Sequence, residues 1–170
     1  MAARRTPSTG QPPPDSERLN GVGEAITWEE PEMVVMHGRR RPDYADDRRF
    51  TRTWWANGGL GPPDHQWRSY IQRGEEVARL LLHLRYPAHS SRTNSPAVMV
   101  WSFEVREDLR CNGTHLGTAI IQQLASEYRD REIYVGPTQQ SASFWARFGW
   151  PMCNCTECDG RDLIVRRPKR

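Results

Sequence analysis

The sequence of 170 residues has no long apolar run, and its longest aliphatic stretch, Leu80-Leu81-Leu82, is ended by His83. Crossing a bilayer takes roughly 20 apolar residues, so we expect no membrane partner. The first residues lead into Gln11-Pro12-Pro13-Pro14 instead of an apolar stretch, which predicts no secretory signal and a cytoplasmic location. In that compartment the four cysteines are expected to be reduced thiols or metal ligands, not disulfides.

Most of the chain also lacks an excess of basic residues. The net charge is +3. Residues 161–170 contain five basic residues and one aspartate and so contribute +4, which leaves −1 on the remainder of the chain. A nucleic-acid-binding module usually concentrates positive charge on its folded surface. The sequence therefore predicts no nucleic-acid partner beyond a weak attraction at the end of the chain. No pattern indicates the oligomeric state.

Hydrophobic residues make up only 36% of the chain, but seven Trp, five Tyr and four Phe supply large buried areas. The length suits one domain with a small core. Residues 1–23 are rich in proline and glycine and are expected to be a flexible tail. We place the single domain at 24–167 and a short basic end at 168–170.

The hydrophobic pattern predicts strands first and a strand-helix-strand unit later in the chain. Gly74 lies in a short turn between two β-type runs, which is typical of a hairpin. The order of elements predicts a mixed α+β or α/β domain. The expected strands are 25–28, 33–36, 67–72, 77–84, 97–105, 133–135 and 163–165, and the expected helices are 43–57, 116–128 and 141–148.

Two glycines, Gly113 and Gly117, stand between the expected strand 97–105 and the expected helix 116–128. Such a loop can turn backbone N–H groups toward an anion, and the helix N-terminus adds about half a positive charge. Glycine allows a phosphate to approach the backbone closely. The pattern is compatible with a phosphate site and with a plain tight turn.

This segment resembles the central motif of the GNAT superfamily of acyl-CoA N-acyltransferases, V-x-P-x-x-R-G-x-G-x-G-x-x-L-L. Val105 and Arg110 stand at the spacing of the motif's V and R, and residues 113–121 resemble its glycine-rich half. This register requires two extra residues, Cys111 and Asn112, and an alternative register without a gap keeps Arg110-x-x-Gly113. Both registers place the pyrophosphate loop within 110–118.

A second stretch, 141–150, is similar to the family's A-x-x-F-Y-x-x-x-G-F, with Phe144 at the F and Trp145 at the Y. The resemblance covers roughly 67–165. It implies a mixed, mostly antiparallel sheet whose central strands splay apart, with helices on its faces. It also implies an enzyme that transfers an acetyl group from acetyl-CoA to a primary amine.

In that family acetyl-CoA lies where the central strands part, and an amine attacks the thioester directly. The resemblance implies that the strand at 98–105 pairs with the pantetheine and that the loop holds the pyrophosphate. The implied cofactor-binding residues are Phe103, Val105, Arg110, Gly113, Thr114, His115, Leu116, Gly117, Thr118, Ser141 and Phe144.

A general base would be a carboxylate near the end of that strand, either Glu104 or Glu107. Strand alternation puts Glu104 on one face with Val100 and Ser102, opposite Trp101, Phe103 and Val105.

The family's tyrosine acid is replaced by Trp145, whose indole cannot act as a phenolic acid. Water, the N–H of Trp145, or Tyr134 would then assist the departing thiolate. Alternatively, the protein is a non-catalytic acyl-CoA-binding or protein-interaction module.

Three cysteines, Cys153, Cys155 and Cys158, stand close together before Asp159-Gly160. Tetrahedral zinc needs four ligands, and the fourth would come from Cys111 or a distant histidine. Because no second C-x-x-C pair is present, free cysteines in a turn are the favoured interpretation and a zinc site is the alternative. A third hypothesis, ranked behind the others, is zinc-dependent nucleic-acid binding through these cysteines and the terminal arginines.

Overall fold

The computed structural model describes residues 25–36, 39–44, 47–51, 64–89, 95–158 and 161–168. The predicted tail at 1–23 and the last two residues lie outside this part of the chain, so the predicted domain limits remain a prediction. None of the described helices is long and apolar enough to cross a membrane. The described elements are β1 (Thr27–Glu29), β2 (Met33–Met36), β3 (Arg39–Pro42), β4 (His65–Gln72), β5 (Glu75–Tyr86), β6 (Ala97–Val105), η2 (Glu107–Leu109), α2 (Leu116–Glu127), β7 (Ile133–Val135), α3 (Ala142–Ala146), η3 (Thr156–Cys158) and β8 (Ile164–Arg166).

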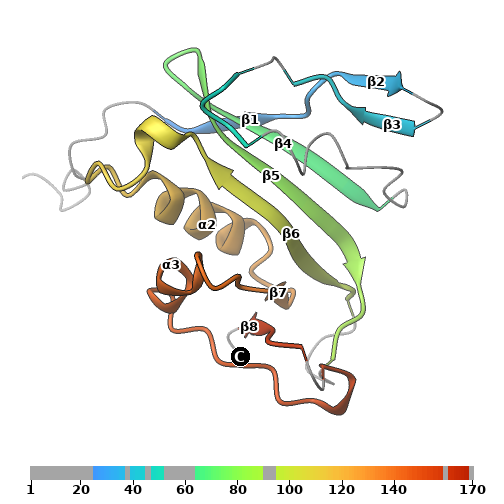
Figure 1. Ribbon diagram of the computed structural model, residues 1–170. Helices are drawn as coiled ribbons and strands as arrows, with labels where there is room; N and C mark the ends of the chain where they lie inside the picture. The colour runs from blue at the N-terminus through green and yellow to red at the C-terminus, as the bar shows by residue number, and fades with distance from the viewer. Residues whose placement is uncertain are drawn as a thin grey trace, which may run out of the picture.

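One six-stranded sheet with the order β1-β4-β5-β6-β7-β8 forms the centre of the molecule (Figure 1). All neighbouring strands are antiparallel except β6 and β7, which are parallel and are connected through α2. A parallel pair needs such a crossover, which explains why a helix follows β6 directly. The predicted class, a mixed and mostly antiparallel sheet flanked by helices, is confirmed.

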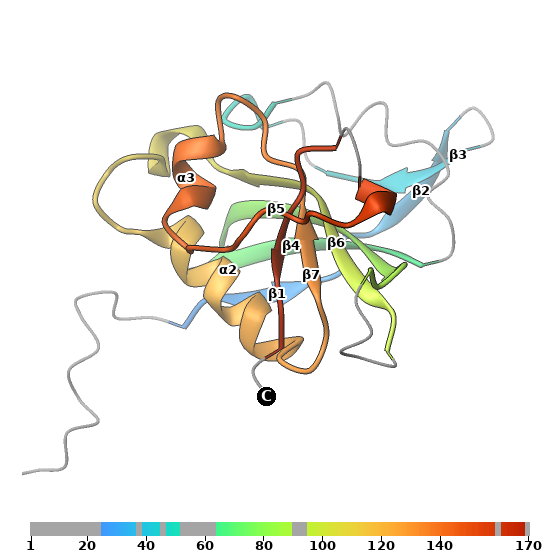
Figure 2. The same cartoon turned by 90° about the horizontal axis from the view of Figure 1, so that it is seen from below.

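The main core lies between the sheet and helices α2 and α3, which cover the same face (Figures 1 and 2). The amphipathic pattern of α2 buries Leu116, Ile120, Ile121 and Leu124 against Val98 and other sheet residues. On the opposite face Trp67 and Leu81 pack with residues near the small β2–β3 hairpin. The helix-covered face therefore carries most of the buried apolar surface.

The predicted helix at 43–57 is wrong where the structure describes it, because residues 47–51 form a turn. Asp47 accepts hydrogen bonds at Oδ1 from the backbone N–H and side chain of Arg49, at 2.9 Å each. Such a local side-chain acceptor competes with the helical backbone pattern. Tyr44 and Phe50 lie over the guanidinium of Arg79, at 4.2 and 4.0 Å, instead of sharing a helical face. Trp54 and Trp55 lie outside the described residues.

Arg68 of β4 connects three elements beneath the end of α2. Its guanidinium donates to both carboxylate oxygens of Glu127 at 2.7 Å and to the Tyr128 hydroxyl at 2.9 Å. The same group lies 3.8 Å from the Trp28 ring centroid, in a cation–π contact with β1. The Arg68 side chain is only 1% exposed, so these contacts replace nearly all of its hydration.

We expect Arg68→Leu to lower the free energy of unfolding by about 2–4 kcal/mol, because it removes one partner of a desolvated ion pair together with the cation–π contact. Urea denaturation measures this loss. Arg129→Leu, at an exposed position just after the same end of α2, serves as the control and should change stability by less than about 0.5 kcal/mol. Equal effects of the two substitutions would contradict this account of how α2 is held.

Candidate functional site

The central strands β6 and β7 pair for only part of their length. The parallel pairing runs from Val98–Ile133 to Val100–Val135, where β7 ends, whereas β6 continues to Val105. Beyond Val100, the β7-facing edge of β6 therefore has no strand partner among the described residues. One carbonyl near this edge, that of Val105, accepts a hydrogen bond from Nε of Arg110 at 2.7 Å.

A β-bulge in β6 lies at the same level. Leu82 pairs with Val100 and Leu81 pairs with Ser102, which leaves Trp101 as an extra residue. The bulge breaks strand alternation, so the predicted face assignment is wrong for two residues. Val100 packs in the main core with Phe103 and Val105, whereas Trp101 is 59% exposed.

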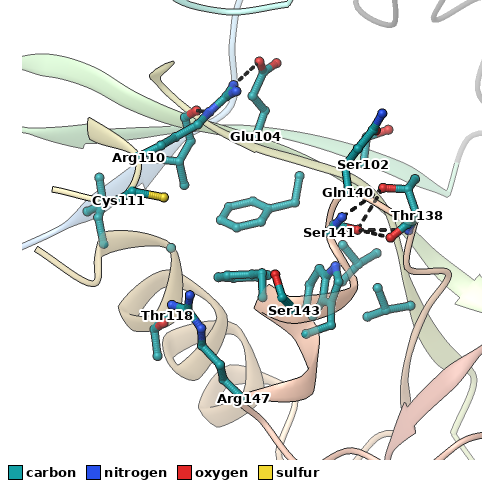
Figure 3. A pocket seen from close by; sticks show the side chains of 18 of the residues that line it. Ser102, Glu104, Arg110, Cys111, Thr118, Thr138, Gln140, Ser141, Ser143 and Arg147 are labelled. Carbon is teal, nitrogen blue, oxygen red and sulfur yellow. Dashed lines mark hydrogen bonds and ion pairs between the residues drawn. The ribbon is translucent and has the colours of Figure 1, made fainter. Parts of the chain in front are cut away.

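A cleft of about 840 Å³ opens where the two strands part. Its walls come from β6, the segment that leads into α2, the chain after β7, and α3 (Figure 3). This volume lies toward the upper end of the roughly 300–1,000 Å³ typical of ligand pockets. The predicted site residues that line the cleft are Phe103, Glu104, Val105, Arg110, Gly113, His115, Leu116, Gly117, Thr118, Ser141, Phe144 and Trp145.

The loop before α2 is tightly curled, with left-handed residues at every second position. The φ angles are 56° at Cys111, 81° at Gly113 and 51° at His115. Asn112 Oδ1 supports the curl by accepting from the backbone N–H of Thr114 at 3.1 Å and from its hydroxyl at 2.7 Å. Left-handed non-glycine residues are energetically costly and cluster at binding sites.

The N-terminus of α2 faces the cleft through Leu116, Gly117 and Thr118. The first N–H groups of a helix have no intrahelical acceptor, and the helix dipole makes this end positive. The N-cap residue His115 supplies no side-chain hydrogen bond to them. This arrangement provides backbone donors for an anion.

Gly117 also sets how closely α2 approaches the other walls of the cleft. A Cβ atom at this position would lie 3.2 Å from Phe144 Cε2 and 3.2 Å from Val105 Cγ2. Glycine thus allows the first turn of α2 to pack directly against α3 and β6. Gly113 has a different role, because its positive φ favours glycine although a Cβ there would meet no atom within 4 Å.

The carboxylate of Glu104 is buried in the cleft wall. Its Oε1 accepts from Arg110 Nη2 at 2.6 Å and from the N–H and hydroxyl of Thr51 at 2.8 and 2.7 Å. Figure 3 shows the Glu104–Arg110 ion pair above the start of α2. The other predicted base, Glu107, is exposed in η2 and does not line the cleft.

Trp145 lies within an aromatic cluster on the cleft floor and is 5% exposed. Its ring centroid is 5.0 Å from that of Phe144 and 6.4 Å from that of Phe103. These contacts bury the indole as a packing group. In the family that the sequence resembles, this position holds a tyrosine acid. Here it holds the buried Trp145, which forms part of the apolar floor of the cleft.

Tyr134, the other predicted acid, does not line the cleft and is 1% exposed. Its hydroxyl donates to Glu132 Oε2 at 2.8 Å and accepts from the backbone N–H of His89 at 3.2 Å. Burial first, and then the Glu132 carboxylate, raise the Tyr134 pKa far above its usual value near 10. Thr114 likewise lies outside the cleft lining, although it belongs to the same loop.

The cleft is also lined by residues that the sequence analysis did not indicate. Arg147, directly after α3, extends in the direction of α2 in Figure 3 and adds a cation to the cleft lining. Thr138 and Ser141 form a turn in which the Thr138 N–H donates to Ser141 Oγ at 2.9 Å. Arg147 stands three residues after Phe144, so helical spacing within the second motif would have indicated it. Thr51 carries no sequence signal because it is remote from both motifs.

Comparison of the sequence with protein-family models found no match, and comparison with curated proteins found none either. Among solved structures, the fold is similar to that of the Bacillus subtilis N-acetyltransferase YlbP in complex with coenzyme A, with 19% identity and a TM-score of 0.47. That match covers 60% of this chain and 67% of YlbP. An acetyltransferase from Thermus thermophilus matches with 19% identity and a TM-score of 0.46, over 61% of this chain and 64% of its own length.

Proposed function

We propose that this protein is an N-acetyltransferase that transfers an acetyl group from acetyl-CoA to a primary amine of an acceptor in the cytoplasm. The observation that carries the proposal is the cleft itself. One wall is the part of β6 that continues beyond the end of its pairing with β7, and the N-terminus of α2 opens into the same space. The two motifs that resemble the GNAT superfamily, at 105–121 and 141–150, both contribute residues to the lining of the cleft.

The cleft offers a separate type of contact for each part of acetyl-CoA. The β7-facing edge of β6 has no strand partner beyond Val100 among the described residues, so it would pair with the pantetheine amides, which would lie along it like an added strand. The N–H groups of residues 113–118 would hold the pyrophosphate at the positive end of α2. Arg147 would add a charge-assisted contact to a phosphate.

In the proposed reaction, a neutral amine nitrogen attacks the carbonyl carbon of the thioester. The C–N bond forms, the C–S bond breaks, and the sulfur leaves as the CoA thiolate. A backbone N–H of β6 polarises the carbonyl oxygen as negative charge develops on it. Glu104 accepts the ammonium proton, because of the two candidate bases it is the one in the cleft.

No tyrosine lines the described part of the cleft. A simple thiol has a pKa of about 8.5, so the thiolate is a tolerable leaving group near neutral pH and takes its proton from water. The lack of a tyrosine in the described lining of the cleft also favours the second candidate function, a non-catalytic acyl-CoA-binding module. That module would bind acetyl-CoA but would release no CoA when an amine is added.

We expect Gly113→Asp to weaken acetyl-CoA binding by at least about tenfold, because it places a negative charge in the loop that faces the pyrophosphate. Gly113→Asn is the matched control, since asparagine tolerates a positive φ and has nearly the same shape without the charge. Calorimetric titration with acetyl-CoA measures both affinities. Equal affinities for the two variants would contradict the assigned phosphate site.

We expect Glu104→Gln to lower kcat by about 100-fold, with little change in the calorimetric affinity for acetyl-CoA, because a positioned general base contributes roughly 10²–10⁴. Release of CoA from acetyl-CoA is followed with a thiol reagent, using a panel of polyamines, aminoglycosides and lysine peptides as acceptors. Glu107→Gln, which changes an exposed carboxylate outside the cleft, should retain kcat within about twofold.

A large loss of kcat in Glu107→Gln, with Glu104→Gln active, would reverse the assignment of the base. If every amine leaves CoA release at the background rate while acetyl-CoA binds, the binding-module function replaces the enzymatic one.

A further inference from the structure

A second cluster of reactive side chains lies outside the cleft. The ligand atoms of His89, Cys153, Cys155 and Cys158 all lie within 4.8 Å of one another. His89 follows β5, whereas the cysteines belong to the segment between α3 and β8, about 65 residues later in the chain. The fold therefore supplies the distant histidine that the sequence alone left unidentified. Cys111, the other predicted fourth ligand, is exposed in the loop before α2 and is not part of the cluster.

Three distances within the cluster are somewhat shorter than those of a tetrahedral metal site, and all its ligand atoms lie within 4.8 Å of one another. Cys153 Sγ is 3.4 Å from Cys155 Sγ, and His89 Nδ1 is 3.3 Å from Cys155 Sγ and 2.8 Å from Cys158 Sγ. Zinc bonds of about 2.3 Å to sulfur and 2.0–2.1 Å to nitrogen put tetrahedral ligand atoms roughly 3.5–3.8 Å apart. Side-chain shifts of about 1 Å around an ion bring the ligand atoms from these separations to this geometry. The thiols are not joined as disulfides.

The surroundings of His89 hold its ring in a ligating orientation. Its Nδ1 points to the sulfur atoms, while Nε2 lies 3.7 Å from the carboxylate of Glu157. A metal-binding histidine usually turns its second nitrogen to a carboxylate or carbonyl, which fixes the tautomer. The side chain is 5% exposed, and its ring packs 5.0 Å from that of Tyr134. The Tyr134 hydroxyl also accepts from the His89 backbone N–H.

The burial of the cluster argues against free cysteines in a simple turn. Cys153 and Cys158 are buried in a second core, smaller than the main one, together with Tyr134, Leu163 and Val165. Three neighbouring thiols and an imidazole in such a place are the soft donors that zinc selects. Because all four positions of a tetrahedron would be filled by protein, the site leaves no open position for a substrate.

We propose that His89, Cys153, Cys155 and Cys158 bind one structural zinc ion. The ion ties the chain after β5 to the segment before β8, across the smaller core. None of the four residues lines the cleft, so the site stabilises the fold and takes no part in acetyl transfer. The proposal is independent of the proposed function and its test uses no acetyl-CoA.

The first test is metal analysis of the purified full-length protein by inductively coupled plasma mass spectrometry. We expect about one zinc per chain, and removal by a strong chelator should lower Tm. Cobalt(II) added to the metal-free protein under reducing conditions should give thiolate-to-cobalt charge-transfer absorption and the visible bands of a tetrahedral site. A protein that carries no zinc and also gives no such cobalt spectrum would overturn the proposal.

Two variants and a control locate the ion. Cys155→Ser should abolish stoichiometric zinc, whereas Cys111→Ser, which removes the thiol outside the cluster, should retain it. Glu157→Gln changes an exposed side chain beside His89, so the fold should survive, and we expect a 10–100-fold weaker zinc affinity in chelator competition. Zinc content that falls in Cys111→Ser and persists in Cys155→Ser would place the metal elsewhere and refute the assigned ligands.

Discussion

The early end of the pairing between β6 and β7 is the constraint on which the rest of the site depends. β7 has only three residues, and its partner strand continues for five more beyond Val100. Those residues remain held on the β5 side, where the bulge at Trp101 changes which side chains face the core. The sheet thus stays intact on the β5 side of β6, while the β7-facing side has no strand partner beyond Val100 among the described residues.

Helices α2 and α3 form further walls of the cleft that opens where β6 and β7 part. Arg68 fixes the C-terminal end of α2 to the sheet through Glu127, and Gly117 lets the other end pack against Phe144 and Val105. The helix N-terminus is therefore held at the mouth of the cleft without a side-chain cap. Trp145 and its aromatic neighbours close the floor of the cleft. Separately, the cysteine–histidine cluster joins the chain after β5 to the segment before β8.

Much of this fold could be predicted from local patterns. The strand at 97–105 and the strand at 133–135 have the predicted limits, and α2 ends one residue earlier than expected. These elements have strong hydrophobic periodicity or a bounded apolar run. The helix expected at 43–57 could not be excluded, because the contacts of Tyr44 and Phe50 with Arg79 are made across the fold. The face of Val100 was misassigned because a bulge leaves no signal in the residue alternation.

The lining of the candidate site could be predicted where it follows a motif, and not where it depends on distant contacts. The loop at 110–118 is continuous in sequence, whereas Thr51 and His89 come from remote segments.

Hydrogen–deuterium exchange of the protein with and without saturating acetyl-CoA tests the central claim most directly. The account predicts slower exchange at the amides of 101–105 and 113–118, on the two walls of the cleft. Unchanged exchange in both segments, with protection confined to other strands, would contradict it.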